Sequence, residues 1–418
     1  MTAGERNADV VVVGAGAAGL ATAIFAARAN PSLRIVALDG AKKLGAKILV
    51  SGGGRCNVTN VRVEPDDFRG ASSHSIRKIL RFFTAADAAE FFHELGVSMH
   101  EEEHGKLFPD SNDAQSVLTA LLVEATRRGV ILHCEHRVSD MVREADSFRI
   151  KTNQGSFCTK QLVLATGGKS LPKTGSDGSG FGLVKALGHS IVEPVPALVP
   201  LLLSGEMHKT LSGIAQDVTL TVRVEGAKPV AQGGALLWTH FGVSGPVVLD
   251  ISGWYTRAQL AGKPALITVN FMPGRDFEQA EKWLVAFAQE HPRETLRGVL
   301  ATVVPMRVGE VLLGELRMDG RTALGQLARE SRRRLVHALV EWPLPVIGDR
   351  GYNYAAGTAG GVPLEEVNVS TMESRIVPGL FLVGEILNVD GRIGGFNFQW
   401  AWSTGAVAGH ALGRSEKM

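Results

Sequence analysis

The chain has 418 residues and carries 44 Lys and Arg against 42 Asp and Glu. The resulting formal net charge of +2 excludes a polybasic binder of nucleic acid or membrane as the default interpretation. Hydrophobic residues make up 45% and charged residues 21%, a balance that excludes extended disorder, and the length favours two domains over a single core.

Cysteine usage and the first apolar stretch indicate a cytoplasmic protein. Cys56, Cys134 and Cys158 are too far apart in the sequence to suggest a disulfide framework or a metal pair. Residues 10–27 carry no charge, but three glycines interrupt them, and Asp9 precedes them instead of a basic run. We therefore expect neither a signal peptide nor a membrane span.

The first predicted unit is a strand, a tight turn and a helix. A β-branched run over 10–13 is followed by Gly14-Ala15-Gly16-Ala17-Ala18-Gly19 and by a small-residue helix over 18–29. A second apolar strand over 33–38 ends at Asp39 and completes a βαβ unit. The glycine spacing fits the dinucleotide fingerprint, in which a helix N-terminus stabilises a pyrophosphate. Asp39 is placed to accept a hydrogen bond from a ribose 2′-OH, which disfavours NADP at this site.

The next segments continue this α/β pattern. We expect a loop rich in lysine and glycine over 42–60, helical segments over 76–95 and 114–128, and a strand over 162–165 that runs into Thr166-Gly167-Gly168. Short strands over 130–134, 148–152 and 156–158 are expected to form a small antiparallel layer.

A second domain is predicted to begin near Val192, where Pro194, Pro196 and Pro200 mark a linker. Residues 218–224 and 265–271 alternate as strands do, and residues 277–342 are helical and charged. We interpret the run Arg332-Arg333-Arg334 as a solvated helix face and not as an RNA patch.

The C-terminal segments favour FAD over NAD. After a glycine-rich loop over 351–361, a strand over 380–383 ends in Gly384-Glu385, and Gly394-Gly395-Phe396-Asn397 precedes a helix over 398–412. A flavin is long, so it needs a second anchoring acid, for which Glu385 is suited, and a positive helix terminus near its ring. No second fingerprint with a following acid is present, so we expect NAD(P)H only as a transient reductant.

Several longer motifs resemble those of one bacterial flavoprotein family. They are Lys43-Leu44-Gly45 through Ser51-Gly52-Gly53-Gly54-Arg55-Cys56-Asn57-Val58-Thr59-Asn60, Ala165-Thr166-Gly167-Gly168, residues 239–246, and residues 383–400. The chain resembles the BaiN/RdsA-like, or aminoacetone-oxidase-like, family of two-dinucleotide-binding-domain flavoproteins. This implies an α/β fold in which a Rossmann-type, glutathione-reductase-like FAD domain (1–191 and 353–418) is interrupted by an inserted domain (192–352). The inserted domain is expected to have a β-barrel-like part over about 192–272 and a helical part over about 275–345. The chain departs from the family at Asp39, where Glu is usual, and at Gly40, where a basic residue often follows.

We assign two sets of site residues on these grounds. Arg55 and Asn57 are expected to donate hydrogen bonds to flavin oxygens, with the alternative that they only brace their loop. His240 is expected to handle a proton, and Arg392 to orient substrate or hold the ring, which makes Arg55, Asn57, His240 and Arg392 the catalytic candidates. The residues assigned to FAD are Gly14, Ala15, Gly16, Ala18, Gly19, Asp39, Lys47, Ser51, Gly52, Gly53, Arg55, Cys56, Asn57, Val138, Ala165, Thr166, Gly167, Gly384, Glu385, Gly394, Gly395, Phe396 and Asn397.

Two tempting motifs are rejected. A redox pair of this kind has four residues between its two cysteines, but Val61 stands at the position of the second thiol, so we expect Cys56 to be a packed residue and not part of a redox pair. His100-Glu101-Glu102-Glu103-His104 matches a zinc motif that requires a helix, but it lies between Gly96 and Gly105 in what we expect to be a solvated turn, so no metal is predicted.

The predicted function is that of an FAD-dependent oxidoreductase that transfers hydride through flavin N5. The resemblance implies reduction of a carbon–carbon double bond, including that of a uridine in ribosomal RNA, or oxidation of a small amine such as aminoacetone with oxygen. An RNA substrate predicts a basic rim beside the flavin, formed by Arg55, Arg77, Lys78 and Arg81. A non-catalytic flavin-binding module is the alternative from another class.

Overall fold

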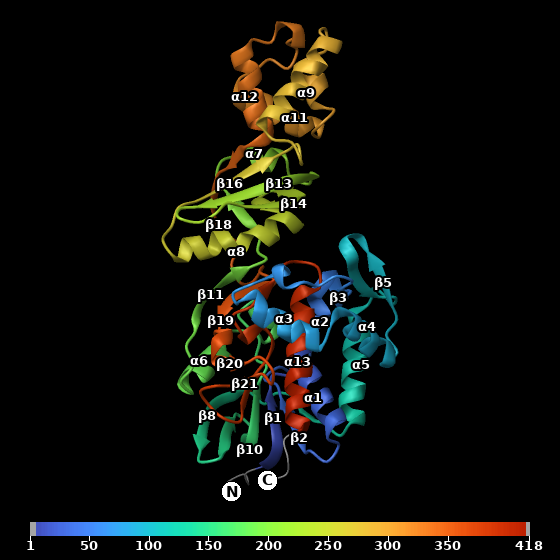
Figure 1. The fold of residues 1–418 in the computed structure, drawn as a ribbon, viewed down its shortest axis with the longest axis vertical. Coiled ribbons are helices and arrows are strands. Elements are labelled where there is room, and N and C mark those ends of the chain that lie inside the picture. The colour runs from blue at the N-terminus through green and yellow to red at the C-terminus, as the bar shows by residue number, and fades with distance from the viewer. Residues whose placement is uncertain (1–5, 415–418) are drawn as a thin grey trace. The chain divides into compact units, whose positions relative to one another are not determined.

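The computed structural model describes residues 6–414, so residues 1–5 and 415–418 of the expected FAD domain lie outside the described residues. The chain divides into two compact units. Unit 1 comprises the residues up to Pro196 and those from Tyr352, and unit 2 comprises Ala197–Gly351. In Figure 1 the green to orange segments of unit 2 interrupt the blue and red segments of unit 1, so unit 2 is an insertion.

A mixed sheet forms the centre of unit 1. Its strands follow the order β20 (Val367–Asn368), β21 (Glu373–Ser374), β22 (Leu380–Leu382), β10 (Gly155–Leu164), β1 (Arg6–Val13), β2 (Ile35–Leu38) and β7 (Ile131–His133). The strands from β22 to β7 are parallel, and short apolar runs such as those of β1 and β2 suit a parallel sheet that is covered on both faces. The predicted Rossmann-type α/β fold with an inserted domain is confirmed.

Two predictions about this sheet are wrong. The segment over 130–134 was expected in an antiparallel layer, but β7 extends the main sheet, with Val36 opposite Ile131 in a parallel pair. Residues 156–158 and 162–165 do not form separate strands, because β10 runs continuously beside β1. The antiparallel layer consists of β8 (Val138–Glu144), β9 (Ser147–Thr152) and the first half of β10.

Helices α3 (Ser73–Phe82), α4 (Ala85–Glu94) and α5 (Ala114–Arg127) of unit 1 each begin at a residue whose side chain caps the helix. The segment predicted over 76–95 is two helices, because Thr84 and Asp87 form a capping box that starts a new helix. Within residues 6–414, none of the helices combines the length and the apolar character that crossing a bilayer requires. The other helices of unit 1 are α1 (Ala17–Ala29), α2 (Ala46–Val50), α6 (Ser179–Ala186) and α13 (Phe396–Arg414).

Short strand pairs tie the loops of unit 1 to its core. The glycine-rich segment over 351–361, expected as a loop, contains β19, which pairs with β11. The short pairings are β3 (Thr59–Asn60) with β6 (Lys106–Pro109), β6 with β5 (Met99–Glu102), β4 (Phe68–Arg69) with β23 (Asp390–Gly391), and β11 (Val192–Ala197) with β19 (Gly357–Gly361).

Unit 2 has its own hydrophobic core and sheet. Its antiparallel strands follow the order β17 (Trp342–Leu344), β16 (Ala265–Asn270), β13 (Ala215–Val224), β14 (Val230–Thr239), β15 (Gly242–Ser244), β12 (Leu201–Leu203) and β18 (Val346–Asp349). Among the described residues this path is open, with β17 and β18 at its ends, whereas a barrel-like part had been expected. The helices are α7 (Met207–Thr210), α8 (Pro246–Leu260), α9 (Phe277–Glu290), α10 (Leu296–Leu300), α11 (Met306–Leu316) and α12 (Arg329–Val340).

Helices α1 and α13, from opposite ends of the chain, pack closely together in unit 1 (Figure 1). Gly405, Gly409 and Gly413 are spaced four residues apart, so they lie on one face of α13. A Cβ atom on Gly409 would lie 2.6 Å from the Cβ of Phe25 and 2.8 Å from the carbonyl oxygen of Thr22. The glycine row therefore permits an approach of the two helices that any side chain would prevent.

We expect Gly409→Ala to lower the free energy of unfolding by about 2 kcal/mol, because the added methyl group overpacks the contact with α1. Gly182→Ala on α6 is the matched control, since a Cβ there meets no heavy atom within 4 Å apart from its chain neighbours. That control should be neutral or slightly stabilising. Thermal melting followed by circular dichroism checks both, and equal melting temperatures would contradict the close packing.

Candidate functional site

The three glycines of the predicted phosphate turn have different surroundings. A Cβ on Gly14 would lie 2.3 Å from the carbonyl oxygen of Ala165, and a Cβ on Gly19 would lie 1.9 Å from that of Gly14. A Cβ on Gly16 meets no heavy atom within 4 Å apart from its chain neighbours. Gly14 and Gly19 are therefore required by the fold itself, whereas Gly16 leaves open space at the start of α1. No side chain caps that helix N-terminus, which suits an anionic ligand.

Asp39 lies beside this turn at the end of β2. Its carboxylate accepts hydrogen bonds from the N–H of Ala15 at 2.9 Å and from that of Ala41 at 2.8 Å. A Cβ on Gly40 would lie 2.7 Å from Cδ of Arg137, so the Arg137 side chain takes the space beside Gly40. The guanidinium of Arg137 itself pairs with Asp177 and donates to Ser179, so the aliphatic part of the side chain makes the contact at Gly40.

A partly buried polar network joins the carboxyl ends of two strands. The Lys47 ammonium lies 2.6 Å from a Glu385 oxygen and 2.9 Å from Oγ of Ser170, which in turn donates to the other Glu385 oxygen at 2.7 Å. Thr358 accepts hydrogen bonds from the N–H groups of Lys169 and Ser170 and fixes that turn. The predicted residues Lys47 and Glu385 are therefore brought together, by helix α2 and by the turn after β22.

The charge of Glu385 is stabilised within this network. Burial by itself would raise the pKa of the Glu385 carboxyl, but the nearby Lys47 ammonium and the hydrogen bonds from Lys47, Ser170 and Thr358 outweigh it and lower the pKa. The Glu385 carboxylate is therefore ionised, with Lys47 as its counter-ion. It lies at the edge of the sheet where α/β proteins bind ligands.

The loop over 51–60 has a strained backbone. Gly52, Gly53 and Gly54 have φ angles of 55°, 70° and 89°, and Cys56 also has a positive φ of 61°. Ser51 fixes the start of the loop by donating to the carbonyl of Ile48. The Cys56 side chain is fully buried, and this burial, against a hydrogen bond from Ser51, raises the pKa of its thiol to about 12. The thiol is therefore protonated at neutral pH.

Arg55 points toward the β5–β6 hairpin. Its guanidinium lies 2.5 Å from a Glu102 oxygen, donates to Asn112 at 3.3 Å, and stacks over the Phe108 ring at 4.1 Å from the centroid. The hydrogen bond and charge of Arg55 in turn lower the pKa of Glu102. This placement favours the alternative in which Arg55 braces its loop.

Asn57 connects the loop to the start of α13. Its amide nitrogen donates to the carbonyls of Thr59 at 2.8 Å and Leu107 at 3.2 Å, and its oxygen accepts from the N–H of Gly395 at 3.0 Å. Thr59 is also held, by a hydrogen bond to Gln399 at 2.6 Å. The loop and the predicted ring-facing helix start therefore form one rigid unit.

Arg392 and Asn397 stabilise the turn before α13. Arg392 Nε lies 2.6 Å from an Asp67 oxygen, and the guanidinium lies over the Phe396 ring. Asn397 bonds reciprocally with Gly391, accepting from its N–H at 2.8 Å and donating to its carbonyl at 3.0 Å. Both predicted residues are engaged in holding the backbone.

Two buried hydroxyl groups in the same region have no protein partner. They are Oγ1 of Thr166 and Oγ of Ser176, which lie within the described part of the chain beside the turn at Gly167. Buried polar atoms are normally paired, so unpaired hydroxyls next to Glu385 and the phosphate turn fit a polar ligand at this position. Together with the open space at Gly16, they fit FAD.

His240 lies in unit 2, at the tip of the hairpin between β14 and β15, and is exposed. Burial of His208, with a further contribution from the charge of Lys209, lowers the pKa of its ring. The Nδ1 of His208 has no hydrogen-bond partner within residues 6–414.

The remaining predicted residues are placed by the same elements. Ala15, Ala165 and Phe396 are buried in unit 1, and Val138 starts β8 with 7% of its surface exposed. A Cβ on Gly384 would lie 2.8 Å from the Cβ of Ala18, so the turn after β22 approaches α1 closely. Residues 100–104 lie on strand β5 and a 3₁₀ turn, which agrees with their rejection as a helical zinc motif.

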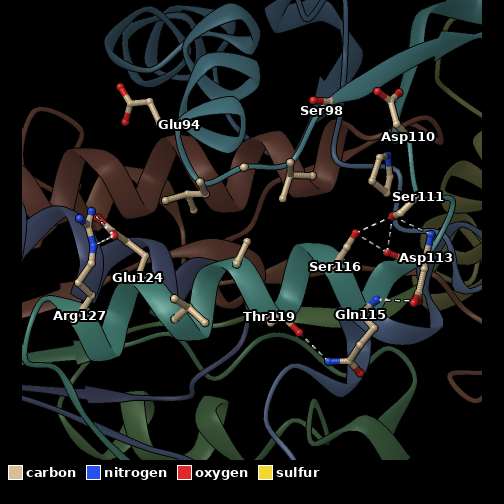
Figure 2. Close-up of a pocket in the computed structure, with 16 residues that line it drawn as sticks. Glu94, Ser98, Asp110, Ser111, Asp113, Gln115, Ser116, Thr119, Glu124 and Arg127 are labelled. Atoms are coloured by element: carbon tan, nitrogen blue, oxygen red, sulfur yellow. Dashed lines mark hydrogen bonds and ion pairs between the residues drawn. The ribbon is translucent and has the colours of Figure 1, made fainter.

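A separate cavity of about 890 Å³ lies in unit 1 between the end of α4, the turn after β6, and α5 (Figure 2). None of the predicted site residues lines it. Figure 2 shows polar side chains that bond to one another, such as Ser111 with Ser116 at 2.8 Å and Glu124 with Arg127. The cavity therefore has no evident link to the phosphate turn.

Sequence reasoning missed Ser170, Thr358, Glu102 and Asp67. Ser170, Glu102 and Asp67 are each a partner of a predicted residue across a long sequence separation, and Thr358 holds the turn that contains Ser170. Only Ser170 had a local signal, since it directly follows the motif Thr166-Gly167-Gly168-Lys169.

Known proteins similar to this chain cover almost its whole length. It is 33% identical to the ribosomal RNA dihydrouridine synthase of Escherichia coli, over 95% of this chain and 96% of that protein. It is 32% identical to the 3-dehydro-bile acid delta(4,6)-reductase of Clostridium scindens, over 96% of this chain and 98% of that protein. Among solved structures, a 3-ketosteroid-delta4-(5alpha)-dehydrogenase from Rhodococcus jostii has a similar fold, with a TM-score of 0.50, 16% identity, and coverage of 99% of this chain and 98% of that one.

The family described as HI0933-like protein Rossmann domain matches residues 8–411. This match agrees with the phosphate turn, the insertion and the C-terminal closure described above. The chain belongs to the HI0933-like family and is an FAD-dependent oxidoreductase.

Proposed function

We propose that this protein reduces the carbon–carbon double bond of a uridine in ribosomal RNA, with NAD(P)H as the transient reductant. The observation that carries the proposal is the cofactor site of unit 1, with open space at Gly16 and unpaired hydroxyls at Thr166 and Ser176. The similarity to a ribosomal RNA dihydrouridine synthase over nearly the full length supports the choice of substrate.

Different residues of unit 1 bind different parts of FAD. The N-terminus of α1 and Gly16 bind the pyrophosphate, and the remaining acceptor positions of the Asp39 carboxylate accept a hydrogen bond from a ribose hydroxyl. Glu385, which is charged and held by Lys47, binds the ribityl region. The N-terminus of α13, with Gly394 and Gly395, faces the ring. Bound FAD supplies a hydride carrier at N5.

The bracing residues keep this arrangement rigid. Asn57 ties the glycine loop to Gly395, and Arg392 is tied to Asp67, so the backbone around the ring position does not need to reorganise on binding. We assign the exchange of a proton with the substrate to His240, because an imidazole suits this role at neutral pH.

A second candidate is reduction of a conjugated double bond in a small molecule. It is favoured by the equally long match to a bile acid reductase. The two candidates share the cofactor site and differ in what approaches the flavin.

The deciding experiment mixes the FAD-loaded protein anaerobically with NADH or NADPH and then adds either unmodified ribosomal RNA or a small enone. We expect bleaching of the flavin by one nicotinamide and reoxidation by RNA, with dihydrouridine detected by mass spectrometry. Reoxidation by the enone alone would support the second candidate. Turnover with oxygen and a small amine, or no turnover with any of these, would contradict both.

We expect Gly16→Val to purify as a folded but colourless protein, because the isopropyl group would occupy the space for the pyrophosphate, whereas a Cβ at this position meets no heavy atom within 4 Å apart from its chain neighbours. The flavin absorbance and the melting temperature of the cofactor-free protein check this. Gly182→Val, at another open position, should stay yellow. A fully yellow Gly16→Val protein would place FAD elsewhere.

We expect Cys56→Ser to retain most of the rate of flavin reduction. The thiol is buried and protonated, with a pKa of about 12, so it supplies no nucleophile at neutral pH. Cys158→Ser is the matched control, and anaerobic stopped-flow absorbance measures both. Loss of turnover in Cys56→Ser with FAD still bound would indicate a thiol mechanism.

A further inference from the structure

Helix α3 carries a row of basic side chains on one face. His74, Arg77, Lys78 and Arg81 follow the spacing i, i+3, i+4, i+7, and all four are exposed. The helix contains no acidic residue. Within residues 6–414, Arg77, Lys78 and Arg81 form no side-chain hydrogen bond, ion pair or ring contact.

Two arginines of unit 1 outside α3 are paired with carboxylates of the protein. Arg28 pairs with Glu94 and Glu124, and Arg55 pairs with Glu102. The expected basic rim therefore loses Arg55, which points to the β5–β6 hairpin. The three cations of α3 keep their full charge available to an external ligand.

The opposite face of α3 belongs to the core. Ile76, Ile79 and Leu80 are at most 6% exposed, so the helix has no apolar face with which to enter a lipid bilayer. Phe82, at the end of the basic row, is 43% exposed and contacts His410 edge-on. An aromatic ring beside a row of cations is the combination that binds single-stranded nucleic acid, through stacking and phosphate contacts.

The position of α3 connects this face to the flavin site. Just before the helix, β4 pairs with β23, Asp67 pairs with Arg392, and the Asn388 amide donates to the carbonyl of Gly70 at 2.9 Å. Helix α3 also packs against α13, beside which it is drawn in Figure 1. The basic row therefore lies on an element fixed to the turn that leads to the predicted ring position.

We propose that the exposed face of α3 binds the phosphate backbone of a single-stranded segment of the RNA substrate. This inference rests on the proposed function and adds the surface by which the RNA is held. Arg77, Lys78 and Arg81 neutralise three phosphates, and Phe82 stacks on a base.

The test compares the FAD-loaded protein with the variant R77Q/K78Q/R81Q in binding to a fluorescein-labelled oligouridine. For three lost phosphate contacts, we expect roughly tenfold weaker binding and a salt dependence, log K against log salt, that is shallower by about 2. The variant K151Q/K160Q/K185Q removes three exposed cations elsewhere in unit 1 and should change affinity less than twofold. Flavin absorbance and melting temperature verify that both variants are folded.

Equal RNA binding by the two triple variants would overturn the inference, as would loss of binding to phosphatidylglycerol vesicles without any loss of RNA binding. Failure of the inference is distinguishable from failure of the proposed function. If the α3 variant still binds RNA normally and forms dihydrouridine, only the docking surface is wrong. If the unmodified protein neither binds RNA nor reduces its uridines, the proposed function and the inference both fail.

Discussion

The close contact between α1 and α13 brings the two ends of the chain to one site. Helix α1 begins at the phosphate turn, and α13 begins at the turn that Asn57 and Arg392 hold in place. Because glycines on α13 let the helices approach, the helix N-termini that suit the pyrophosphate and the flavin ring are set by one packing interaction. The positions of Gly16 and Gly395 thus depend on residues in the middle of both helices.

Ion pairs within unit 1 also hold distant segments of the chain together around the proposed cofactor site. Lys47 with Glu385 and Arg392 with Asp67 are each partly buried, and each joins segments that are far apart in the sequence. Removing one partner of such a pair leaves an uncompensated charge, so both members are constrained together. The polar residues around the proposed cofactor therefore stabilise the folded structure of the site itself as well as the bound FAD.

The sequence predicted those parts of the molecule whose signals are local. The phosphate turn, the strand ending at Asp39 and the final helix each have a motif that a few neighbouring residues define, and the structure places them in one unit. Strand β7 was misplaced, because three residues carry no periodicity that separates a parallel from an antiparallel neighbour. The orientation of Arg55 toward Glu102 was not predictable either. Glu102 lies 47 residues further along the chain, and it comes close to Arg55 only because the β5–β6 hairpin pairs with β3 in the folded protein.

The insertion also has a consequence for the order in which the protein forms on the ribosome. Unit 2 is contiguous, from Ala197 to Gly351, and has its own core, so it can fold as soon as it has emerged. Unit 1 cannot, because α1 is synthesised before unit 2 and the face it buries is supplied by α13, which follows unit 2. Until α13 has emerged, the small apolar side chains of α1 lack their partner, and nascent chains are expected to need protection from aggregation throughout that interval.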